Sequence, residues 1–367
     1  MIIECGAASI ALLEQNRVCW WKQGISPTLI TRIGITTIKA CSYLETCFTL
    51  TEDGLILLAR SLSELESSPT DVTACICDIL GISSTSEIVE IDIAFLNIIA
   101  VTEYVISIID IRYDGVLRPV TVCKYPSMID LFAISGNKIV YRTDRGLYVI
   151  GEYAKLERIV CDEDTVVSIK EIVCDLLHIY LVMDDGRILE CPHYYYKSGS
   201  YKAIRLIEFP EATMITELTV GCQFALCLDS NGDCWGIYPD APGYYHSLLS
   251  GRILREYTVT RLFVTTNYIV ILCDEGQQLL MKTDKLRSAL TVSGGYATIE
   301  SWPLQGIEIA AVVESSFDLY LITMDGQVYV CTIQDNKPCL RLKPFFTDRP
   351  IAVRDRSMAI RSASSVL

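Results

Sequence analysis

The sequence predicts an all-β protein, a single β-propeller built from four-stranded blades. Two observations lead to this prediction. Short apolar segments rich in Val, Ile, Leu and Tyr, the residues typical of strands, recur along all 367 residues. A hairpin motif recurs with them about every 44 residues, a spacing within the range of propeller blades.

The clearest copy of the hairpin motif lies at residues 220–236, V-G-C-Q-F-A-L-C-L-D-S-N-G-D-C-W-G. It predicts a strand, a tight turn and a returning strand. In the turn, Asp229 and Asn231 can bond to their own backbone, and Gly232 supplies the positive φ that a tight reversal needs.

The same motif can be followed through the chain by its turn. Eight copies are expected, and their turns are centred on Asn16, Gly54, Glu103, Gly146, Gly186, Gly232, Gly276 and Gly326. The copy at 97–108 has no glycine and is the weakest match. Asparagine replaces glycine in the first copy because it also tolerates left-handed geometry.

Two further strands complete each expected blade. An apolar segment precedes the hairpins, as at 35–39, 90–93, 128–132, 215–220 and 307–312. An outer strand follows them, as at 29–33, 120–124, 204–208 and 340–343. A four-stranded blade cannot bury both of its faces alone, so radial stacking of blades is expected.

Helical signals are nearly absent. We expect residues 60–86 and 281–306 to be long loops between strands, with one short helical turn at 62–67 and a partly helical stretch at 285–291.

The copy around Gly232 also carries a family pattern, G-x-x-x-A-L-x-x-x-x-x-G-x-x-W-G, formed by Gly221, Ala225, Leu226, Gly232, Trp235 and Gly236. This pattern resembles the repeat of the regulator of chromosome condensation family. The resemblance implies a seven-bladed propeller, whereas eight hairpins are counted. It departs from the family at Gln223 and Phe224, where a histidine is usual, and in lacking a G-Q-L-G element.

The domain prediction is a propeller over residues 1–345 and a basic C-terminal tail over 346–367. Residues 341–367 carry six Lys and Arg against two Asp, so the rest of the chain has a formal charge of about −18. The tail is interpreted as a docking arm that uses Arg349, Arg354, Arg356 and Arg361, or as a solvated terminus. Its apolar segments at 351–353 and 358–360 could instead supply a strand that closes the ring.

Charge and cysteine content indicate which partners and which cellular compartment are expected. The formal net charge of −14 argues against a body that coats nucleic acid or an anionic membrane. Sixteen cysteines occur without a C-x-x-C pair and with only three histidines, which favours reduced, core-filling thiols in the cytoplasm over a zinc site. A cytoskeletal or nuclear association is compatible with this setting. Residues 1–13 make a poor signal peptide, and charged residues interrupt the apolar window at 91–109.

Motifs for catalysis are not found in the sequence. It contains no G-x-x-x-x-G-K-[ST] loop and no G-x-S-x-G elbow. The paired carboxylates mostly fall in the predicted turns, and 162–164 is expected to be a loop without a complete oxygen cage for a cation. We therefore expect no catalytic residues, no bound metal and no cofactor.

The candidate partner-binding residues form two aromatic clusters. Each is expected in the loop between the third and the outer strand of a blade, in consecutive copies of the repeat. Equivalent loops of neighbouring blades emerge on one side, so the clusters should form one patch. Its members are His193, Tyr194, Tyr195, Tyr196, Tyr201, Tyr244, Tyr245 and His246. Tyrosine makes large contacts at low entropy cost, so such a patch suits a protein partner.

The function predicted from these observations is a non-enzymatic protein-interaction scaffold, a component of a larger protein assembly such as a cytoskeletal one. The alternative, implied by the family resemblance, is a guanine-nucleotide exchange factor for a small GTPase. The expected partners are thus proteins, either a small GTPase or a cytoskeletal polymer, with no direct nucleic-acid or membrane contact.

Overall fold

The structure is a computed structural model of residues 1–367. It describes residues 2–5, 9–14, 17–22, 28–31, 37–43, 46–51, 53–60, 64, 68–94, 97–111, 116–135, 138–150, 156–159, 161–174, 178–192, 205–209, 214–221, 224–241, 244–252, 257–265, 267–283, 286, 300–301, 308–315, 318–323, 328–334 and 337–343.

The chain divides into two compact units. Unit 1 comprises Met1–Ile129 and Ile309–Asp355, and unit 2 comprises Asp130–Glu308 and Arg356–Leu367. Within the described residues, each unit contains four antiparallel sheets of four strands. Each sheet corresponds to one copy of the hairpin motif, including the glycine-free copy at 97–108.

Unit 1 contains the sheets of the first three copies and of the last copy. Their strands are β1 Ile2–Cys5, β2 Ser9–Glu14, β3 Arg17–Lys22, β4 Thr28–Thr31, β5 Thr37–Tyr43, β6 Thr46–Thr51, β7 Ile56–Ala59, β8 Thr70–Asp71, β9 Ile88–Ala94, β10 Asn97–Thr102, β11 Val105–Asp110, β12 Arg118–Lys124, β29 Ile309–Ser315, β30 Asp318–Thr323, β31 Val328–Gln334 and β32 Lys337–Lys343.

Unit 2 contains the four sheets in between. Their strands are β13 Ile129–Ser135, β14 Lys138–Thr143, β15 Gly146–Ile150, β16 Leu156–Ile159, β17 Ile169–Cys174, β18 His178–Met183, β19 Ile188–Pro192, β20 Arg205–Leu206, β21 Ile215–Gly221, β22 Phe224–Asp229, β23 Cys234–Ala241, β24 Tyr244–Arg252, β25 Val259–Val264, β26 Tyr268–Cys273, β27 Gln278–Lys282 and β28 Glu300–Ser301. Among the described residues, unit 1 also contains the helix α2 Thr73–Leu80 and the 3₁₀ turn η1 Thr85–Glu87, and unit 2 contains the helix α3 Glu163–Val167 and the 3₁₀ turn η2 Asp274–Gly276.

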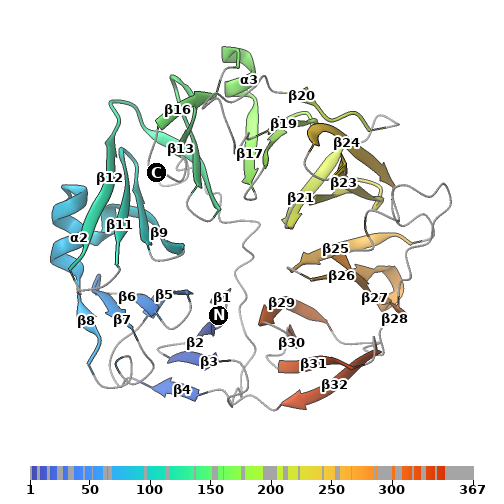
Figure 1. The fold of residues 1–367 in the computed structure, drawn as a ribbon, viewed down its shortest axis with the longest axis horizontal. Helices are drawn as coiled ribbons and strands as arrows, with labels where there is room; N and C mark the ends of the chain where they lie inside the picture. The colour runs from blue at the N-terminus through green and yellow to red at the C-terminus, as the bar shows by residue number, and fades with distance from the viewer. Residues whose placement is uncertain are drawn as a thin grey trace. The chain divides into compact units, whose positions relative to one another are not determined.

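Every sheet is a meander in which the strands pair in chain order. Inside a unit, the first strand of one sheet contacts the first strand of the next, as β17 does with β21 and β21 with β25 (Figure 1). Repeated four-stranded meanders that stack through their faces are the blades of a β-propeller, so the predicted fold class is confirmed. The number of blades in a closed ring stays a prediction.

The expected turn chemistry is also confirmed where the turns are described. Gly54, Gly146, Gly186, Gly232 and Gly276 all have positive φ, with 79° at Gly186 and at Gly232. The turns centred on Asn16 and Gly326 lie outside the described residues. The turn without a glycine joins β10 to β11 through Glu103 and Tyr104.

These turns also connect consecutive sheets of unit 2. The carbonyl of Gly232 accepts a hydrogen bond from the amide of Val259, the first residue of the following sheet, at 2.7 Å. Ser230 N in the same turn donates to Met214 O, just before the sheet's own first strand. The turn at Gly186 repeats this arrangement with Ile215 N and with Ser168 O. Each of these turns therefore joins two sheets through backbone atoms.

The core lies between the faces of consecutive sheets. In unit 2, one apolar cluster joins β14 and β15 to β17, β18 and β19, and another joins β22 and β23 to β25, β26 and β27. In unit 1, Phe48 and Ile56 pack with Ile76 of α2 and with Ile98 of β10. Burial of these aliphatic side chains, at about 25 cal/mol per Å², supplies the driving force for stacking.

Two expected loops contain helices instead. Residues 60–86 were expected to form one long loop, but they include β8, the eight-residue helix α2 and η1. Ile76 and Leu80 of α2 lie four residues apart and are both buried, and the helix ends at Gly81 with φ 70°. The acidic segment 162–164 is likewise the start of α3. The helical stretches expected at 62–67 and 285–291 lie almost entirely outside the described residues.

Candidate functional site

We distinguish the two ends of each four-stranded sheet in unit 2 as the turn end and the tyrosine end. The turn end carries the tight turn between the second and third strands, such as the one at Gly186. The tyrosine end is the opposite end, where the third strand continues toward the outer strand. In the sheets of β17–β20 and β21–β24, it is the end at which Pro192 and Ala241 complete the third strand.

The structure describes only one of the two predicted aromatic clusters. His193, Tyr194, Tyr195, Tyr196 and Tyr201 lie outside the described residues. Tyr244, Tyr245 and His246 were expected in a loop, but they form the first three residues of the outer strand β24. The connection between β23 and β24 is therefore short, and the aromatic residues belong to the sheet itself.

The pairing of β23 with β24 is irregular at this point. Pro239 pairs with Leu248 and Ala241 pairs with Tyr244, so residues 245–247 lie opposite the single residue Asp240. Such a bulge leaves residues out of the regular ladder, and bulges are over-represented at sheet edges and next to functional sites. Tyr245 and His246 are thus part of a backbone bulge on the outermost strand of the sheet.

A buried polar cluster lies at the same end of the preceding sheets. His178 begins β18, and its side chain is only 1% exposed. Its Nε2 lies 3.9 Å from Oε1 of Glu190 on β19, which is fully buried. Lys138 of β14, also buried, donates from Nζ to the His178 carbonyl at 3.2 Å. This lysine joins two consecutive sheets next to the point where the chain enters segment 193–204.

The thiol beside this cluster is not a reactive one. Burial, with a smaller contribution from the neighbouring Glu190 carboxylate and against the opposing charge of Lys138, raises the pKa of Cys191 to about 12. A thiol with so high a pKa stays protonated at neutral pH and is a poor nucleophile. The cluster therefore has the character of a structural connection between sheets.

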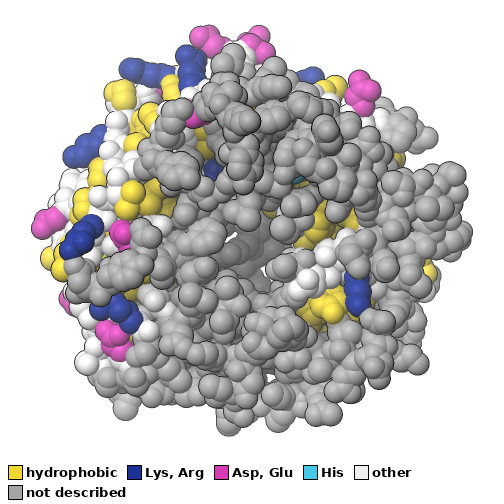
Figure 2. Space-filling view, viewed as in Figure 1, with side chains coloured by type: hydrophobic (Ala, Val, Ile, Leu, Met, Phe, Trp, Pro, Cys, Tyr) yellow, Lys and Arg dark blue, Asp and Glu magenta, His cyan; other side chains and the backbone are white. Residues whose placement is uncertain are grey.

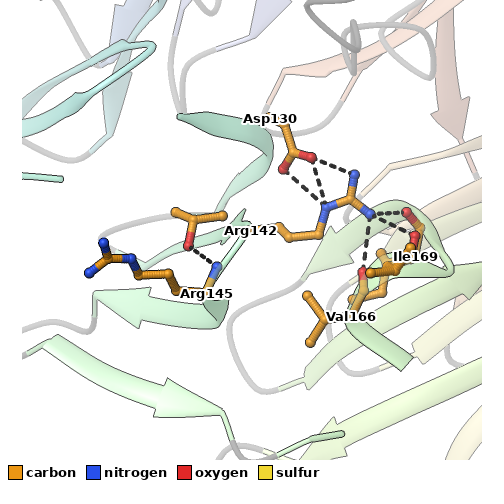
Figure 3. A network of polar contacts seen from close by, with 7 residues as sticks. Asp130, Arg142, Arg145, Val166 and Ile169 are labelled. Atoms are coloured by element: carbon orange, nitrogen blue, oxygen red, sulfur yellow. Dashed lines mark hydrogen bonds and ion pairs between the residues drawn. The ribbon is translucent and has the colours of Figure 1, made fainter. Parts of the chain in front are cut away.

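The turn end contains a second polar network, which the sequence did not reveal (Figure 3). Arg142 of β14 binds Asp130 of β13 through Nε–Oδ1 at 3.0 Å and Nη2–Oδ2 at 2.8 Å. Its Nη1 also donates to the carbonyls of Val166 and Ile169, which lie at the end of α3 and the start of β17. A guanidinium provides the several donors that this arrangement requires, and a cation is favourable at a helix C-terminus.

The start of α3 is fixed as well. The Asp162 carboxylate accepts a hydrogen bond from Thr165 N at 2.7 Å as the N-cap of the helix. This bond lowers the pKa of Asp162, so the group stays ionised at neutral pH. Both ends of α3 are therefore held by side chains of unit 2.

A pair of carboxylates lies on neighbouring first strands of unit 2. Glu171 of β17 and Glu217 of β21 occupy equivalent positions, each directly after the residue skipped by a register shift. Burial, against the opposing charge of Lys170 and with a smaller contribution from the charge of Glu217, raises the pKa of Glu171 to about 7. Glu171 is thus partly protonated at neutral pH.

The best-preserved copy of the motif is structural. Trp235 is buried, and its Nε1 donates to Oδ2 of Asp229 at 2.9 Å. Oδ1 of the same Asp229 accepts from Asn231 N and Asp233 N inside the turn. Asp229 therefore links the turn to the tryptophan of the returning strand.

Among the described residues, no group of three or more His, Cys, Asp or Glu side chains is arranged to hold a metal ion. No helix in the described part of the chain is long and apolar enough to span a membrane. The basic residues Arg349, Arg354, Arg356 and Arg361 lie outside the described residues.

No protein-family model matches the sequence, and no curated protein matches it closely. Similarity appears among solved structures instead. The computationally designed Ika8 protein is 13% identical, with a TM-score of 0.51 over 86% of this chain and 88% of its own. Prp20p from Saccharomyces cerevisiae, described as binding Gsp1p and histones, is 11% identical, with a TM-score of 0.40 over 78% of this chain and 72% of its own.

Hsv2 from Kluyveromyces lactis is 8% identical, with a TM-score of 0.47 over 93% of this chain and 97% of its own. At such low identity the likeness to Ika8 concerns the fold alone, and it agrees with the repeated four-stranded meanders. The chain is a β-propeller protein.

Proposed function

We propose that the protein is a non-enzymatic interaction scaffold, which binds a protein partner at the tyrosine end of the sheets β17–β20 and β21–β24. The observation that carries this proposal is the bulge at residues 245–247, because it sets Tyr245 and His246 apart from the regular ladder on an outermost strand. Tyrosine residues at such positions are good anchors for a partner.

The buried Lys138–His178–Glu190 cluster supports the same reading. It fixes the base from which segment 193–204 leaves β19, so a partner would meet a rigid support there. Rigid support lowers the entropy cost of binding. The second aromatic cluster, Tyr194–Tyr196 with Tyr201, would then extend the binding surface from one sheet to the next.

The test is recovery of partners by affinity purification with the full chain. Replacing Tyr195 and Tyr245 together by serine should reduce recovery of specific partners at least tenfold, since two aromatic anchors are each worth about 1–2 kcal/mol or more. Tyr104→Ser is the matched control, because Tyr104 is an exposed tyrosine on a turn of unit 1. Equal recovery by the double variant, with an unchanged thermal melt, would remove this surface from the proposal.

The resemblance to the regulator of chromosome condensation family keeps exchange activity on a small GTPase as the alternative function. Exchange would require no covalent chemistry, only preferential binding of the nucleotide-free GTPase. Release of a fluorescent nucleotide from a panel of small GTPases separates the two functions. Acceleration by the wild-type chain would replace the scaffold proposal with the exchange factor.

A further inference from the structure

Two exposed arginines meet at the tight turn between β14 and β15 in unit 2. Arg145 lies in this turn, directly before Gly146, and Arg158 lies on the outer strand β16, where it pairs with Tyr148 of β15. Nη2 of Arg158 donates to the carbonyl of Arg145 at 3.1 Å, and the Tyr148 hydroxyl donates to the same oxygen at 3.5 Å. Arg145 and Arg158 are therefore neighbours on one sheet.

The turn leaves room for the guanidinium of Arg158. Gly146 has a φ of 142°, and a Cβ at this position would lie 3.2 Å from Nε and 3.3 Å from Nη2 of Arg158. A glycine thus allows the guanidinium to lie against the turn. A guanidinium has five N–H donors, and among the described residues only the Arg145 carbonyl accepts from this one. The other donors of Arg158 are available to a ligand.

Neither guanidinium has an anionic partner in the part of the chain that the structure describes. In the same unit, by contrast, Arg142 pairs with Asp130 and Arg187 pairs with Asp185. In Figure 3, the side chain of Arg145 points away from Asp130 and Arg142, and no dashed line reaches its guanidinium. Figure 2 shows Asp and Glu side chains gathered over α3, with Lys and Arg side chains beside them on the side of β16.

Two neighbouring cations without a carboxylate favour an anionic ligand with more than one charge. One bidentate guanidinium satisfies a single carboxylate. A phosphate monoester carries about two negative charges and three strong acceptor oxygens, so it can bind two guanidinium groups at once. A pair of arginines therefore suits a phosphoryl group better than a carboxylate.

The charge of the whole chain indicates the source of this phosphoryl group. A formal net charge of −14 repels extended polyanions, such as nucleic acids and anionic membranes. A peptide with one phosphorylated residue carries little net charge and meets less repulsion. Recognition of phosphorylated segments by clustered arginines is a recurring mode of protein–peptide binding.

We propose that Arg145 and Arg158 bind a phosphorylated side chain of a protein partner. The guanidinium of Arg158, placed against the turn, binds one side of the phosphoryl group, and that of Arg145 binds the other. This site lies at the turn end of the sheet β13–β16 and uses none of the residues of the partner surface proposed at the tyrosine end. Failure of either proposal therefore leaves the other intact.

Fluorescence anisotropy with the full chain tests this site. The probe is a labelled library of short peptides with a central phosphoserine and degenerate flanks, and the reference is the same library with unmodified serine. The wild type should bind the phosphorylated library about tenfold more tightly, a difference of about 1.4 kcal/mol. Arg145→Gln combined with Arg158→Gln should abolish this difference.

Arg187→Gln is the matched control, because Arg187 is exposed in another turn of unit 2 but is already paired with Asp185. It should keep the wild-type preference for the phosphorylated library. Arg145→Gln alone keeps the test valid if the double variant melts at a lower temperature, because the hydrogen bonds of Arg145 use only its backbone atoms. This single variant should weaken binding of the phosphorylated library about threefold.

Equal binding of the two libraries by the wild type would overturn the proposal, and so would a full preference retained by both arginine variants. A library with glutamate in place of phosphoserine that binds as tightly would assign the site to carboxylates and would also overturn it. Inorganic phosphate, a single-stranded oligonucleotide and vesicles containing phosphatidylserine serve as competitors. If any of them displaced the probe at a lower concentration than the unlabelled phosphorylated library does, the assignment to a protein partner would be wrong.

Discussion

Gly232 has to satisfy two constraints at once, a φ of 79° and close contact with the next sheet. A Cβ at this position would lie 2.5 Å from Thr258 Cγ2. Gly276 has a φ of 73° in the corresponding turn, but a Cβ there would meet nothing within 4 Å. The two glycines therefore separate the cost of the backbone conformation from the cost of the contact.

We expect Gly232→Ala to lower the free energy of unfolding by about 2–3 kcal/mol and Gly276→Ala by about 1 kcal/mol. The difference arises because only alanine at 232 must displace Thr258. Urea unfolding of both variants measures it. Equal losses would show that the contact at Gly232 relaxes without cost.

The raised pKa of Glu171 makes the free energy of unfolding depend on pH. Its folded-state pKa of about 7 lies above the ordinary value of 4.5 for a glutamate, so between these pH values the folded protein holds a proton that the unfolded chain releases. Its contribution is therefore most favourable below pH 4.5 and is lost as the pH rises through 7. This loss should be modest because the side chain is only partly buried.

We expect Glu171→Gln to be nearly neutral at pH 5 and to raise the free energy of unfolding by about 1 kcal/mol at pH 8. Removing the carboxylate removes the cost of ionising a largely buried group, to which the charge of Glu217 adds a smaller part. Urea titrations at the two pH values measure the difference. If Glu171→Gln changed the free energy of unfolding equally at both pH values, the raised pKa of Glu171 would be contradicted.

At the scale of elements, α3 depends on a residue from another sheet. Arg142→Ala would leave the carbonyls of Val166 and Ile169 without their donor and would leave Asp130 without its partner. We expect a loss of about 1–3 kcal/mol in unfolding free energy and faster amide exchange across 163–168.

Arg187→Ala is the control for this prediction. Arg187 also pairs with an aspartate, but both side chains are more than half exposed and lie in one turn. Exposed pairs of this kind contribute less than about 1 kcal/mol. If both variants exchange equally at α3, the role assigned to Arg142 is wrong.

The elements themselves were predictable where one local pattern dominated. The tight turns were found because Asp, Asn and Gly are required there, and even the glycine-free pair β10 and β11 followed from its apolar segments. Helix α2 was missed because its β-branched and cysteine residues resemble strand residues. The spacing of Ile76 and Leu80, followed by Gly81, was the available signal for a helix.

At the scale of the whole molecule, the repeat predicted the meandering sheets and their stacking. The candidate surfaces were less accessible to sequence reasoning. The tyrosine clusters were noticed by composition, but the bulge at 245–247 depends on pairing across two strands. The network of Arg142 joins residues up to 39 positions apart, from Asp130 to Ile169, so no local pattern could reveal it.

The backbone bonds between the turns and the following sheets have a consequence for how this chain can change over time. At Gly186 and Gly232, they use a carbonyl and an amide that every residue type except proline can supply. The turn itself demands only a residue that accepts a positive φ. Side chains at most positions of a repeat can then be substituted while the backbone hydrogen bonds between the turn and the next sheet are kept. This explains how eight copies with so few residues in common can still build the same sheet.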